Sequence, residues 1–523
     1  MSSKNDMSRR NFVKSIAAVG AAAGATMGAS GALASEKADQ ASSGSWDDEA
    51  DVIVVGAGLS GLCAAVEAAQ AGADTLVLEV MSDALASDSA LSGGMVQGAC
   101  TSVQKQAGVN DSIEEFEKYL SAVGEGYEDP DLRHLYASKS GEGIDWLIGL
   151  GVDFPVEQLS EFGTMVEYYT DVTPAVPRMH WTSAMSGSGI TSVVEQAATD
   201  AGARFSFETQ ATSLLTDESG QVTGVVATVG GEQRRYCAHR GVVLATAGYT
   251  RNPDMIRNFA SLYVSGIDSS RPQFGSYGSP WQKGDGITMG MKVGAGLKNP
   301  WCAYNVAPGI ACDPDSNSAA YLMEGLGIFV SSDAKRHFKE TERISELKVK
   351  DIWEQEGGYV WAVWDQDNAD AIMAASSALC TGGSPDLSTE TEAGYVCQAD
   401  TLEELAEWAG IDADELKATV DAYNSSCASG SDEFGRTYSL VPIATAPFYC
   451  AKVIACTPDT AGGLSVNTSL EVLDVLGDPI PGLYAAGNTC GGFKGKINAG
   501  CGQALGWGVV SGRTAGKSAA SRS

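Results

Sequence analysis

One segment near the N-terminus constrains the fold more than any other. The run DVIVV (residues 51–55) is short, apolar and β-branched, as in a buried strand, and it leads directly into GAGLSG (56–61). A helical pattern, LCAAVEAAQAG, follows, and a second strand-like run (75–78) ends at Glu79, eighteen residues after Gly61. Strand, glycine turn, helix, strand and terminal acid therefore stand in the order of a βαβ unit that binds a dinucleotide.

Each marked position of this unit has a physical task. Gly56 makes the tight turn, Gly58 lets a pyrophosphate approach the backbone at a helix N-terminus, and Gly61 packs the helix on the strand. Glu79 can accept a hydrogen bond from a ribose hydroxyl. By spacing alone, the nucleotide could be NAD or FAD.

Length and charge narrow the class of protein. A chain of 523 residues exceeds the roughly 250 to 300 at which one core stops growing, so at least two domains are expected. An apolar fraction of 44% with 62 Gly and 16 Pro is that of a globular α/β protein. The 34 basic and 66 acidic residues give a net charge of −32, which would repel a phosphate backbone, so nucleic acid is not an expected partner.

The N-terminus has the features of an export signal. The motif SRRNFVK (8–14) precedes a mildly apolar Ala/Gly run, and Ala32-Leu33-Ala34 offers a small-residue cleavage site. Residues 1–34 resemble a twin-arginine signal peptide, and 35–48 read as a polar linker. No other apolar run approaches the roughly 18 residues of a membrane span. We expect a protein exported by the twin-arginine route, cleaved near Ala34 and soluble in the periplasm or at the cell surface.

Later segments favour FAD. RGVVLATAGY (240–249) and GLYAAGN (482–488) are strand-like runs that enter glycine turns. Together with ALSGG (90–94), GDGI (284–287), IFVSSDAKRHFKE (328–340) and TAGGL (460–464), they resemble the flavoprotein family of soluble fumarate reductases, urocanate reductases and 3-ketosteroid dehydrogenases. The matches run in order through nearly the whole mature chain.

The resemblance implies an α/β architecture of two domains. A Rossmann-like FAD-binding domain is split in sequence into 49–298 and 456–523, and an α+β capping domain is inserted at 299–455. TLEELAEWAGIDADELKATVDAYN (401–424) has the pattern of a helical pair within this cap. Export fits this cofactor, because the twin-arginine route carries folded proteins and FAD is available in the cytoplasm.

The FAD-contacting positions expected from these motifs form one set. They are Gly56, Gly58, Leu59, Ser60, Gly61, Glu79, Ser92, Gly93, Gly94, Ala211, Ala247, Gly248, Asp285, Gly487, Asn488, Ala504 and Leu505.

The basic cluster of Lys335, Arg336, His337 and Lys339 in this acidic chain has two interpretations. In the family, the similar segment carries an arginine that acts as general acid, and the resemblance places Arg336 there, with Glu324 or Glu340 as the proton relay. Such an acid is required because flavin N5 gives a hydride to one alkene carbon and the neighbouring carbon needs a proton. The other reading is a solvated turn, in which Arg336 pairs with acids such as Glu340 and Glu342.

The expected substrate departs from fumarate. Fumarate reductases grip two carboxylates with two histidines and an arginine, whereas WCAYNVAP (301–308) holds no His, Asp459 stands before the TAGGL pair, and 495–506 holds no Arg. His134, His180 and His239 lie outside these motifs. A neutral or bulky conjugated carbonyl compound is therefore expected, such as a steroid-like or aryl enone or an unsaturated lactone, with Tyr304 or Tyr249 as a donor to its carbonyl. The expected catalytic set is Arg336, Glu324 and Tyr304.

Two tempting patterns fail. GGFKGKI (491–497) has GxxxGK spacing and Ile497 where a P-loop needs Ser or Thr, so it reads better as glycine-rich backbone facing the flavin. The twelve cysteines include no CxxC and no CxxCH, which excludes covalent haem c on this chain and gives no metal site. An iron–sulfur centre built from distant cysteines stays open.

Without haem, electrons must come from a partner. A small redox protein or a membrane quinol-linked cytochrome is the expected donor. The alternatives are a 3-ketosteroid-type dehydrogenase running the reverse reaction, a fumarate- or urocanate-type reductase, and a flavin electron-transfer protein without substrate.

Overall fold

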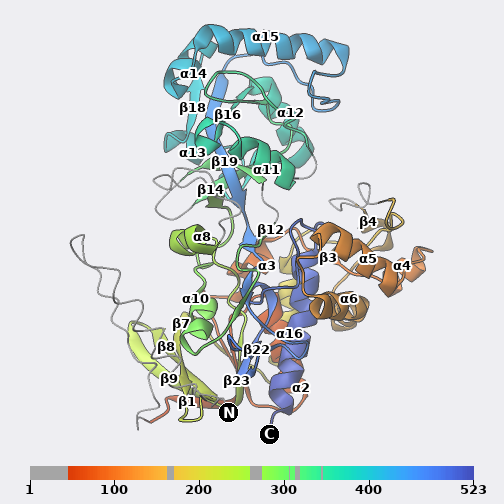
Figure 1. Cartoon of the computed structure of the whole chain (residues 1–523), viewed down its shortest axis with the longest axis vertical. Helices are drawn as coiled ribbons and strands as arrows, with labels where there is room; N and C mark the ends of the chain where they lie inside the picture. The colour runs from red at the N-terminus through yellow and green to blue at the C-terminus, as the bar shows by residue number, and fades with distance from the viewer. Residues whose placement is uncertain (1–44, 162–169, 260–273, 305–306, 313–317, 343–344) are drawn as a thin grey trace, which may run out of the picture.

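The computed structural model describes residues 45–523 except 162–169, 260–273, 305–306, 313–317 and 343–344. The expected signal peptide and most of the expected linker lie outside the described residues. Two eight-stranded sheets organise the chain, one in the lower half of Figure 1 and one in the upper half. The α/β fold class is confirmed.

The lower sheet contains the βαβ unit. Its main path runs β22 (Glu471–Leu473), β23 (Pro479–Ala485), β9 (Glu232–Leu244), β1 (Asp48–Val55), β2 (Thr75–Leu78) and β6 (Arg204–Ser206), and β7 (Thr209–Thr216) and β8 (Val222–Val229) continue from β9 as antiparallel strands. Strands β23, β9, β1, β2 and β6 are parallel. Val55 pairs with Leu78 and Leu244, and Leu244 with Ala485, so the carboxyl ends of four strands meet at one edge. Ligands bind at this edge in open parallel sheets.

Helices cover this sheet closely. Helix α2 (Leu59–Gln70) begins at the glycine turn, and the C-terminal helix α16 (Gln503–Ser521) lies against it (Figure 1). Helix α7 (Ser188–Asp200) also packs against α2. An added Cβ at Gly512 or Gly516 would come within 2.2 or 2.3 Å of an α2 carbonyl oxygen, which explains why α16 is glycine-rich on this face. The segment between β2 and α7 forms η1 (Ala84–Ala86), α3 (Asp88–Leu91), β3 (Met95–Gln97), α4 (Ser102–Gln106), α5 (Ile113–Gly124), α6 (Pro130–Leu150), η2 (Val156–Gln158), β4 (Leu159–Ser160) and β5 (Met179–Trp181).

The upper sheet forms the cap. Its order is β15 (Ile328–Val330), β16 (Val360–Asp365), β19 (Phe448–Thr457), β13 (Ala307–Ala311), β14 (Ala319–Leu322) and β17 (Cys380–Thr381), with β10 (Phe274–Ser276) and β18 (Val396–Ala399) also on β19. Its helices are α11 (Ser345–Trp353), η4 (Glu356–Gly358), α12 (Gln366–Ser376), α13 (Ser388–Glu392), α14 (Leu402–Ala409) and α15 (Ala413–Ser429). The expected helical pair is confirmed as α14 and α15, with Thr401 and Asp412 as their N-caps.

The chain passes between the two halves on adjacent strands. Strand β10, which precedes residue 299, pairs in parallel with β19, so that Ser276 lies opposite Thr457 and both strands run toward the cavity. Strand β13 pairs with β19 in the antiparallel direction and runs into the cap. Helix α8 (Pro253–Phe259) precedes β10, and α10 (Asp285–Lys292), β11 (Leu297–Lys298) and β12 (Ala303–Tyr304) follow it. After β19 come β20 (Asp459–Thr460), β21 (Gly463–Leu464) and η5 (Gly487–Thr489). The cap sheet thus starts earlier in sequence than the expected insertion.

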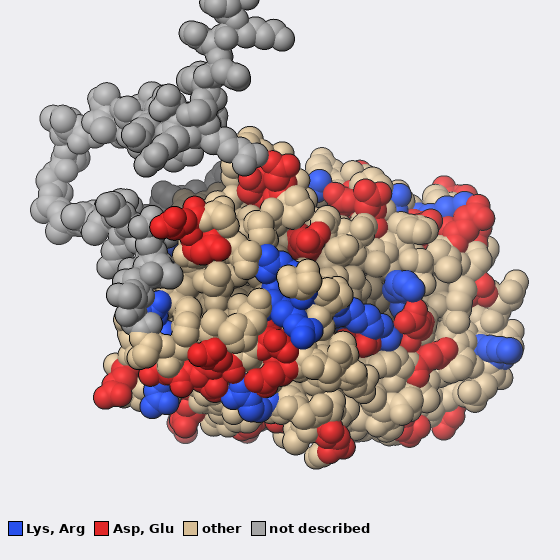
Figure 2. All heavy atoms as spheres, turned by 90° about the horizontal axis from the view of Figure 1, so that it is seen from below, with Lys and Arg blue, Asp and Glu red and all other residues tan. Residues whose placement is uncertain are grey.

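The described surface matches the acidic composition. The face in Figure 2 shows Lys and Arg groups interspersed with Asp and Glu groups and with uncharged surface. Within residues 45–523, as far as the structure describes them, no helix is both long and apolar enough to cross a membrane.

Candidate active site

A cavity of about 720 Å³ lies at the carboxyl edge of the lower sheet. Fourteen of the seventeen expected cofactor positions line it: Gly56, Gly58, Leu59, Ser60, Glu79, Ser92, Gly93, Ala211, Ala247, Asp285, Gly487, Asn488, Ala504 and Leu505. The other three, Gly61, Gly94 and Gly248, lie behind the wall, where an added Cβ would come within 1.9 to 2.5 Å of neighbouring atoms. The sequence motifs therefore converge on one cavity.

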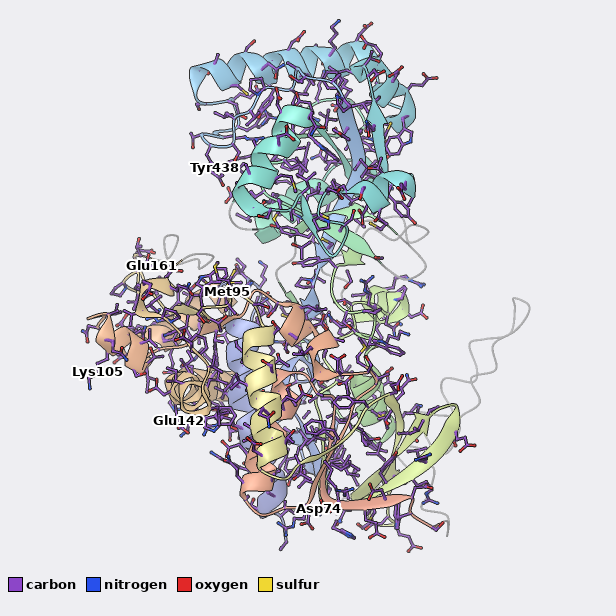
Figure 3. All side chains as sticks on the ribbon, turned by 180° about the vertical axis from the view of Figure 1, so that it is seen from behind. Asp74, Met95, Lys105, Glu142, Glu161 and Tyr438 are labelled. Atoms are coloured by element: carbon purple, nitrogen blue, oxygen red, sulfur yellow. The ribbon has the colours of Figure 1, made fainter. Side chains whose placement is uncertain are left out.

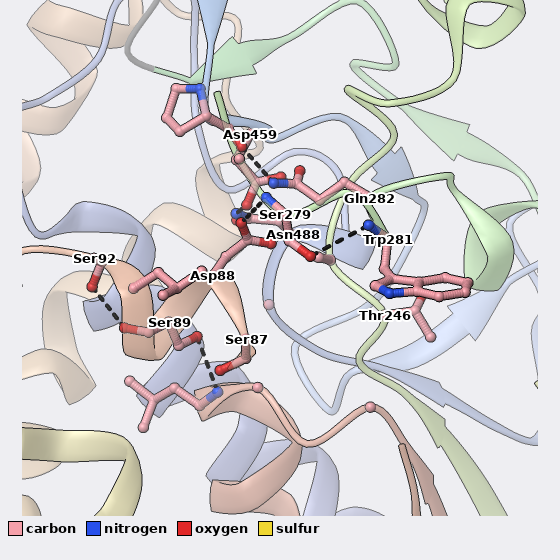
Figure 4. Close-up of a pocket in the computed structure, with 18 of the residues that line it drawn as sticks. Ser87, Asp88, Ser89, Ser92, Thr246, Ser279, Trp281, Gln282, Asp459 and Asn488 are labelled. Carbon is pink, nitrogen blue, oxygen red and sulfur yellow. Dashed lines mark hydrogen bonds between the residues drawn. The ribbon is translucent and has the colours of Figure 1, made fainter. Parts of the chain in front are cut away.

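The glycine turn leaves room on the cavity side. Gly56 has φ +104°, and an added Cβ would lie 2.4 Å from the Ala245 carbonyl oxygen, so only glycine fits. A Cβ at Gly58 would meet nothing nearer than Ser89 Oγ at 3.6 Å, which leaves this backbone open to a ligand. The Leu59 N–H donates to Ser89 Oγ at 3.1 Å at the start of α2 (Figure 4).

Glu79 lies at the cavity wall, as expected, but its main contacts are with the protein backbone. Its carboxylate accepts from the Ala57 N–H at 2.5 Å and from the Met81 N–H at 2.8 Å. A carboxylate has about four acceptor positions, so both bonds are compatible with a ribose hydroxyl as a third donor. Glu79 therefore also holds the glycine turn against the end of β2.

The cavity fits FAD because its backbone N–H groups, rather than basic side chains, can bind the pyrophosphate. The N-terminal ends of α2, α10 and α16 all contribute lining residues, Leu59, Asp285 and Ala504 among them, and helix N-termini attract anions such as a pyrophosphate. Asn488 Oδ1 is buried at the wall with no hydrogen-bond partner in the described protein, as expected of a side chain that awaits a ligand hydroxyl. The donor set and the glycine cradle therefore fit the cofactor expected from the sequence.

A buried acid, Asp459, faces the cavity. Its carboxyl accepts from the Thr460 N–H at 2.8 Å and from Asn488 Nδ2 (Figure 4). Burial raises the pKa of Asp459 well above its usual range, and the charge of Asp88 raises it further, against the lowering effect of these hydrogen bonds.

Asp88, at the start of α3, is the second acid of this wall. Its carboxylate accepts from the Ser279 N–H at 2.6 Å. Burial raises the pKa of Asp88 to about 6, although Ser279, Gln282 and the charge of Arg251 lower it. Both shifts favour the protonated form, and the repulsion between the two carboxylates makes a proton on Asp459 harder to remove.

The cap closes one end of the cavity with aromatic side chains. Tyr277, which follows β10, and Tyr321, on β14, stack with ring centroids 5.4 Å apart and an interplanar angle of 27°. Trp281 also lines the wall. Gly382 makes the close approach possible, because its φ is +86° and an added Cβ would lie 2.6 Å from the Tyr277 Cβ. These residues give this end of the cavity an aromatic surface.

Arg336 lies in the cap and is absent from the cavity lining. Its guanidinium donates to both oxygens of Glu340, at 2.6 and 2.7 Å, and to Asp432 at 2.6 Å, and its side chain is 5% exposed. Burial lowers the pKa of Arg336, but the hydrogen bonds and charges of the two carboxylates outweigh this and raise it. The structure thus favours the alternative of an ion-paired arginine, buried rather than solvated, over direct proton delivery.

The other expected catalytic residues are also separated from Arg336. Glu324 accepts from the Tyr438 hydroxyl, lies 3.8 Å from Lys348 Nζ, and makes no bond to Arg336; Tyr438 is labelled on the cap in Figure 3. Of the two relay candidates, Glu340 is the one that contacts Arg336. Tyr304 lies on β12 directly opposite Asp459 on β20, next to the cavity wall.

The remaining candidates for substrate contact lie elsewhere. The Tyr249 hydroxyl donates to the Pro300 carbonyl, and burial raises the pKa of Tyr249. His134 pairs with Glu117, His180 contacts Thr101, and His239 pairs with Glu49. Within the described lining of the cavity there is no histidine, and Arg251, whose guanidinium donates to the Gly278 carbonyl at 2.7 Å, is the one cation.

Few side chains that could bind a metal ion lie close together in the described part of the chain. One group of potential ligands, Glu49, Cys237 and His239, comes together there, and it lies at the far end of β9, away from the cavity. None of the twelve cysteines, all of which lie within the described residues, forms a disulfide bond.

Sequence reasoning missed Asp88, Tyr277, Tyr321 and Arg251. Asp88 lies two residues before Ala90, the first residue of the ALSGG motif, and could have been weighed with it. The two tyrosines carry no local pattern. The cap sheet brings them together, because β10 pairs with β19 and a bridge joins Ser276 at its end to Ser318, just before β14.

Comparison with known proteins agrees with this site. Residues 51–505 match the model of the FAD binding domain family. The chain belongs to this family. It is 28% identical to the digoxin reductase of Eggerthella lenta over an alignment covering 98% of this chain and 97% of the relative.

Two solved structures share the fold over nearly the whole chain. The open conformation of a flavocytochrome c3 fumarate reductase superposes with a TM-score of 0.72 at 25% identity, covering 99% of this chain and 82% of that one. The 3-ketosteroid-Δ4-(5α)-dehydrogenase of Rhodococcus jostii RHA1, in complex with 4-androstene-3,17-dione, gives 0.65 at 28% identity, covering 93% and 100%. The chain is therefore an FAD-dependent oxidoreductase of the class that acts on C=C and CH–CH bonds, which confirms the expected family, enzyme class and cofactor.

Proposed function

We propose that this enzyme reduces the activated C=C bond of an uncharged conjugated carbonyl compound, such as a steroid-like or aryl enone or an unsaturated lactone. The observation that carries the proposal is the charge of the cavity wall. Asp88 and Asp459 both line the cavity, and the one described cation of the lining, Arg251, is bonded to a backbone carbonyl. A dicarboxylate would be repelled there, because like charges in a low dielectric cost several kcal/mol.

The aromatic end of the cavity supports a flat, apolar substrate. Tyr277, Tyr321 and Trp281 offer ring faces and edges, against which a fused or aromatic ring system gains contact area. Two relatives named above point the same way, since one is named for digoxin and the other for a 3-ketosteroid.

FAD, when bound, supplies the hydride that adds to the alkene carbon. The chain's own residues then hold the cofactor through the glycine turn and three helix N-termini, and orient the substrate between the cap and the lower sheet. The carbonyl-proximal carbon still needs a proton.

The sequence assigned this proton to Arg336, and its buried ion pairs argue for a different role. A guanidinium bound to two carboxylates with a raised pKa is a poor acid. We assign Arg336 the positioning of the segment that follows it. Arg343 is the other arginine of residues 331–350 and lies outside the described residues.

We further propose export by the twin-arginine route, on the motif SRRNFVK and the small-residue site before Ala34. The proposed electron donor is a small redox protein or a quinol-linked cytochrome outside the cytoplasm. Relatives named fumarate reductase (cytochrome) support a donor of this kind.

An anaerobic oxidation experiment tests the proposed reaction. The purified enzyme is reduced with a viologen, and reoxidation is followed on adding fumarate, urocanate, cinnamate, 4-androstene-3,17-dione or a butenolide. We expect reoxidation by an uncharged enone or lactone and none by fumarate. Faster reoxidation by fumarate would overturn the charge argument, and bleaching of the oxidised flavin by a saturated ketone would assign the dehydrogenase direction.

A variant tests the role of Arg336. Arg336→Ala is expected to lower the thermal stability of the cap as well as turnover. A loss of turnover in Arg336→Ala at unchanged stability would restore Arg336 as the acid.

A further inference from the structure

We propose that Asp459 donates a hydrogen bond to the carbonyl oxygen of the uncharged substrate, and that Asp88 is the positioning residue that keeps Asp459 protonated. This inference rests on the proposed function and names how the substrate is recognised. Nothing in the sequence motifs predicted it, because Asp459 was noted there only as a residue that repels carboxylates.

The location of Asp459 carries the first step. It lies at the start of β20, immediately after β19 returns from the cap, and it lines the cavity beside Pro458. Tyr277 and Tyr321 line the same cap-facing end. A ring system packed against the tyrosines would therefore bring its polar edge to this stretch of wall.

The hydrogen-bond pattern carries the second step. Backbone and amide donors from Thr460 and Asn488 hold the two oxygens of Asp459 in place. Those bonds fix the orientation of the carboxyl but do not supply its proton. A neutral carboxylic acid keeps one O–H, which can be donated into the cavity.

The third observation is the negative charge of Asp88. Its negative charge is held by the Ser279 N–H and by Gln282 and Arg251, all from the loops around the passage to the cap. Asp88 Oδ1 and the carbonyl oxygen of Pro458, the residue before Asp459, both lie beside Gly278, within 3.1 and 2.2 Å of the place that its Cβ would take. A negative charge this close to Asp459 disfavours a second one and so favours the protonated form of Asp459. This is the arrangement in which an acid can act as a hydrogen-bond donor rather than as a base.

The chemical consequence follows from where charge develops. When hydride adds to the alkene carbon β to the carbonyl, the electron pair of the C=C bond moves toward the carbonyl oxygen. A donor already aimed at that oxygen stabilises the developing charge without reorganisation. A substrate carboxylate at the same place would meet the charge of Asp88 instead.

Infrared spectroscopy gives a direct test that needs no turnover. 4-Androstene-3,17-dione labelled with ¹³C at the C3 carbonyl is bound to the oxidised FAD enzyme, and isotope-edited difference spectra are recorded. The carbonyl band is expected at lower frequency than in buffer, and this shift is expected to disappear in Asp459→Ala. A shift that persists in Asp459→Ala would overturn the proposal.

The matched control is Asp351→Asn. Asp351 lies on α11 of the cap, burial also raises its pKa, and it is absent from the cavity lining. Its replacement is expected to leave the carbonyl band where it is. Flavin absorbance per protein, measured for every variant, verifies folding and cofactor loading.

Kinetics separates Asp88 from a merely structural residue. Activity requires protonated Asp459, so it is present at low pH and is lost as pH rises through the pKa of Asp459. Asp88→Asn removes the neighbouring charge and should move this alkaline limb to lower pH by about one unit. The ionisable groups lining this end of the cavity are Asp88, Asp459, Arg251, Tyr277, Tyr321 and Cys501. A uniform loss of activity with an unmoved limb would refute the role given to Asp88.

Turnover distinguishes failure of this inference from failure of the proposed function. Asp459→Ala is expected to lower kcat/KM for an uncharged enone by about 10²- to 10³-fold, the usual effect of removing one donor to a developing oxyanion. If the wild-type enzyme reduces uncharged enones and Asp459→Ala does so equally well, the function stands and the inference fails. If no enone reoxidises the wild-type flavin, the proposed function itself fails.

Discussion

The two sheets of this protein are stabilised and used in opposite ways. The lower sheet is mainly parallel and meets its ligand through backbone: a glycine turn, strand ends and helix N-termini. The cap sheet is mainly antiparallel, and its helices and loops are tied by a buried network of charged side chains around Arg336. The glycine turn of the lower sheet should therefore be disrupted by an added side-chain atom, whereas the cap should be disrupted by the loss of one charged side chain.

The cap network is more extensive than one ion pair. Arg336 bonds Glu340 and Asp432, Arg436 lies 3.5 Å from Glu340, and the Arg436 guanidinium also donates to the Gly327 carbonyl at 2.7 Å. The rings of Tyr423 and Phe434 lie within 5.2 Å of the Arg336 guanidinium carbon. Every charge in this network is matched, which buried charges require.

The largest effect is expected from a substitution at the glycine turn. In Gly61→Ala the new Cβ would lie 1.9 Å from the Gly56 carbonyl oxygen, so α2 would have to move off the turn that holds the cofactor. We expect a protein that fails to retain FAD, measured as flavin absorbance per protein after gel filtration. The control is Gly149→Ala on α6, where nothing lies within 4 Å of the new Cβ, and normal flavin content is expected. Normal flavin content in Gly61→Ala would contradict the tight packing.

The next largest effect is expected in the cap. Arg336→Met leaves Glu340 and Asp432 buried and unpaired, which should cost about 3 to 5 kcal/mol of unfolding free energy. Thermal unfolding and limited proteolysis of the cap would measure it, with flavin content retained because the lower sheet is untouched. Lys350→Met, which removes an exposed pair with Glu354, is the control and should leave the melting temperature unchanged.

The same network predicts a pH dependence. Burial raises the pKa of Asp432, but hydrogen bonds from Arg336 and from the Arg436 backbone outweigh this and lower it. A lowered carboxyl pKa stabilises the fold above the ordinary Asp value of about 4, and this stability is lost as pH falls through the lowered pKa. In Arg336→Met, stability should depend less steeply on pH between about 4 and 2, and an unchanged slope would count against the ion pair.

The smallest expected effect is a gain in stability rather than a loss. Burial raises the pKa of Asp88 to about 6, so stability falls as pH rises from about 4 through 6, and at pH 7 the carboxylate destabilises the fold. Asp88→Asn should therefore stabilise the protein at pH 7 by about 1 to 3 kcal/mol and change little at pH 4. Asp432→Asn, the same change in the cap, should destabilise it. Destabilisation by both would show that the cavity wall is built like the cap.

The difference between the regions also explains which expectations held. The βαβ unit, its strand ends and most of its cavity positions could be read from the sequence, because a glycine turn and an alternation of strand and helix are local patterns with local physical causes. The α14 and α15 pair was readable for the same reason. Arg336 was not, because its partners Glu340 and Asp432 are 4 and 96 residues away, and only folding decides whether a basic cluster is solvated, catalytic or buried.

The sequence by itself determined the cofactor-binding fold and the family. It also showed that the histidines and the arginine that bind carboxylates in fumarate reductases are absent from the matching motifs. The tertiary structure decided the rest: the charge of Asp88 acts on Asp459 although 371 residues separate them, and β10 brings Tyr277 to Tyr321. The physical reason is range. Turn geometry and helix periodicity act between neighbours in sequence, whereas burial, charge coupling and ring stacking depend on which distant strands pack together.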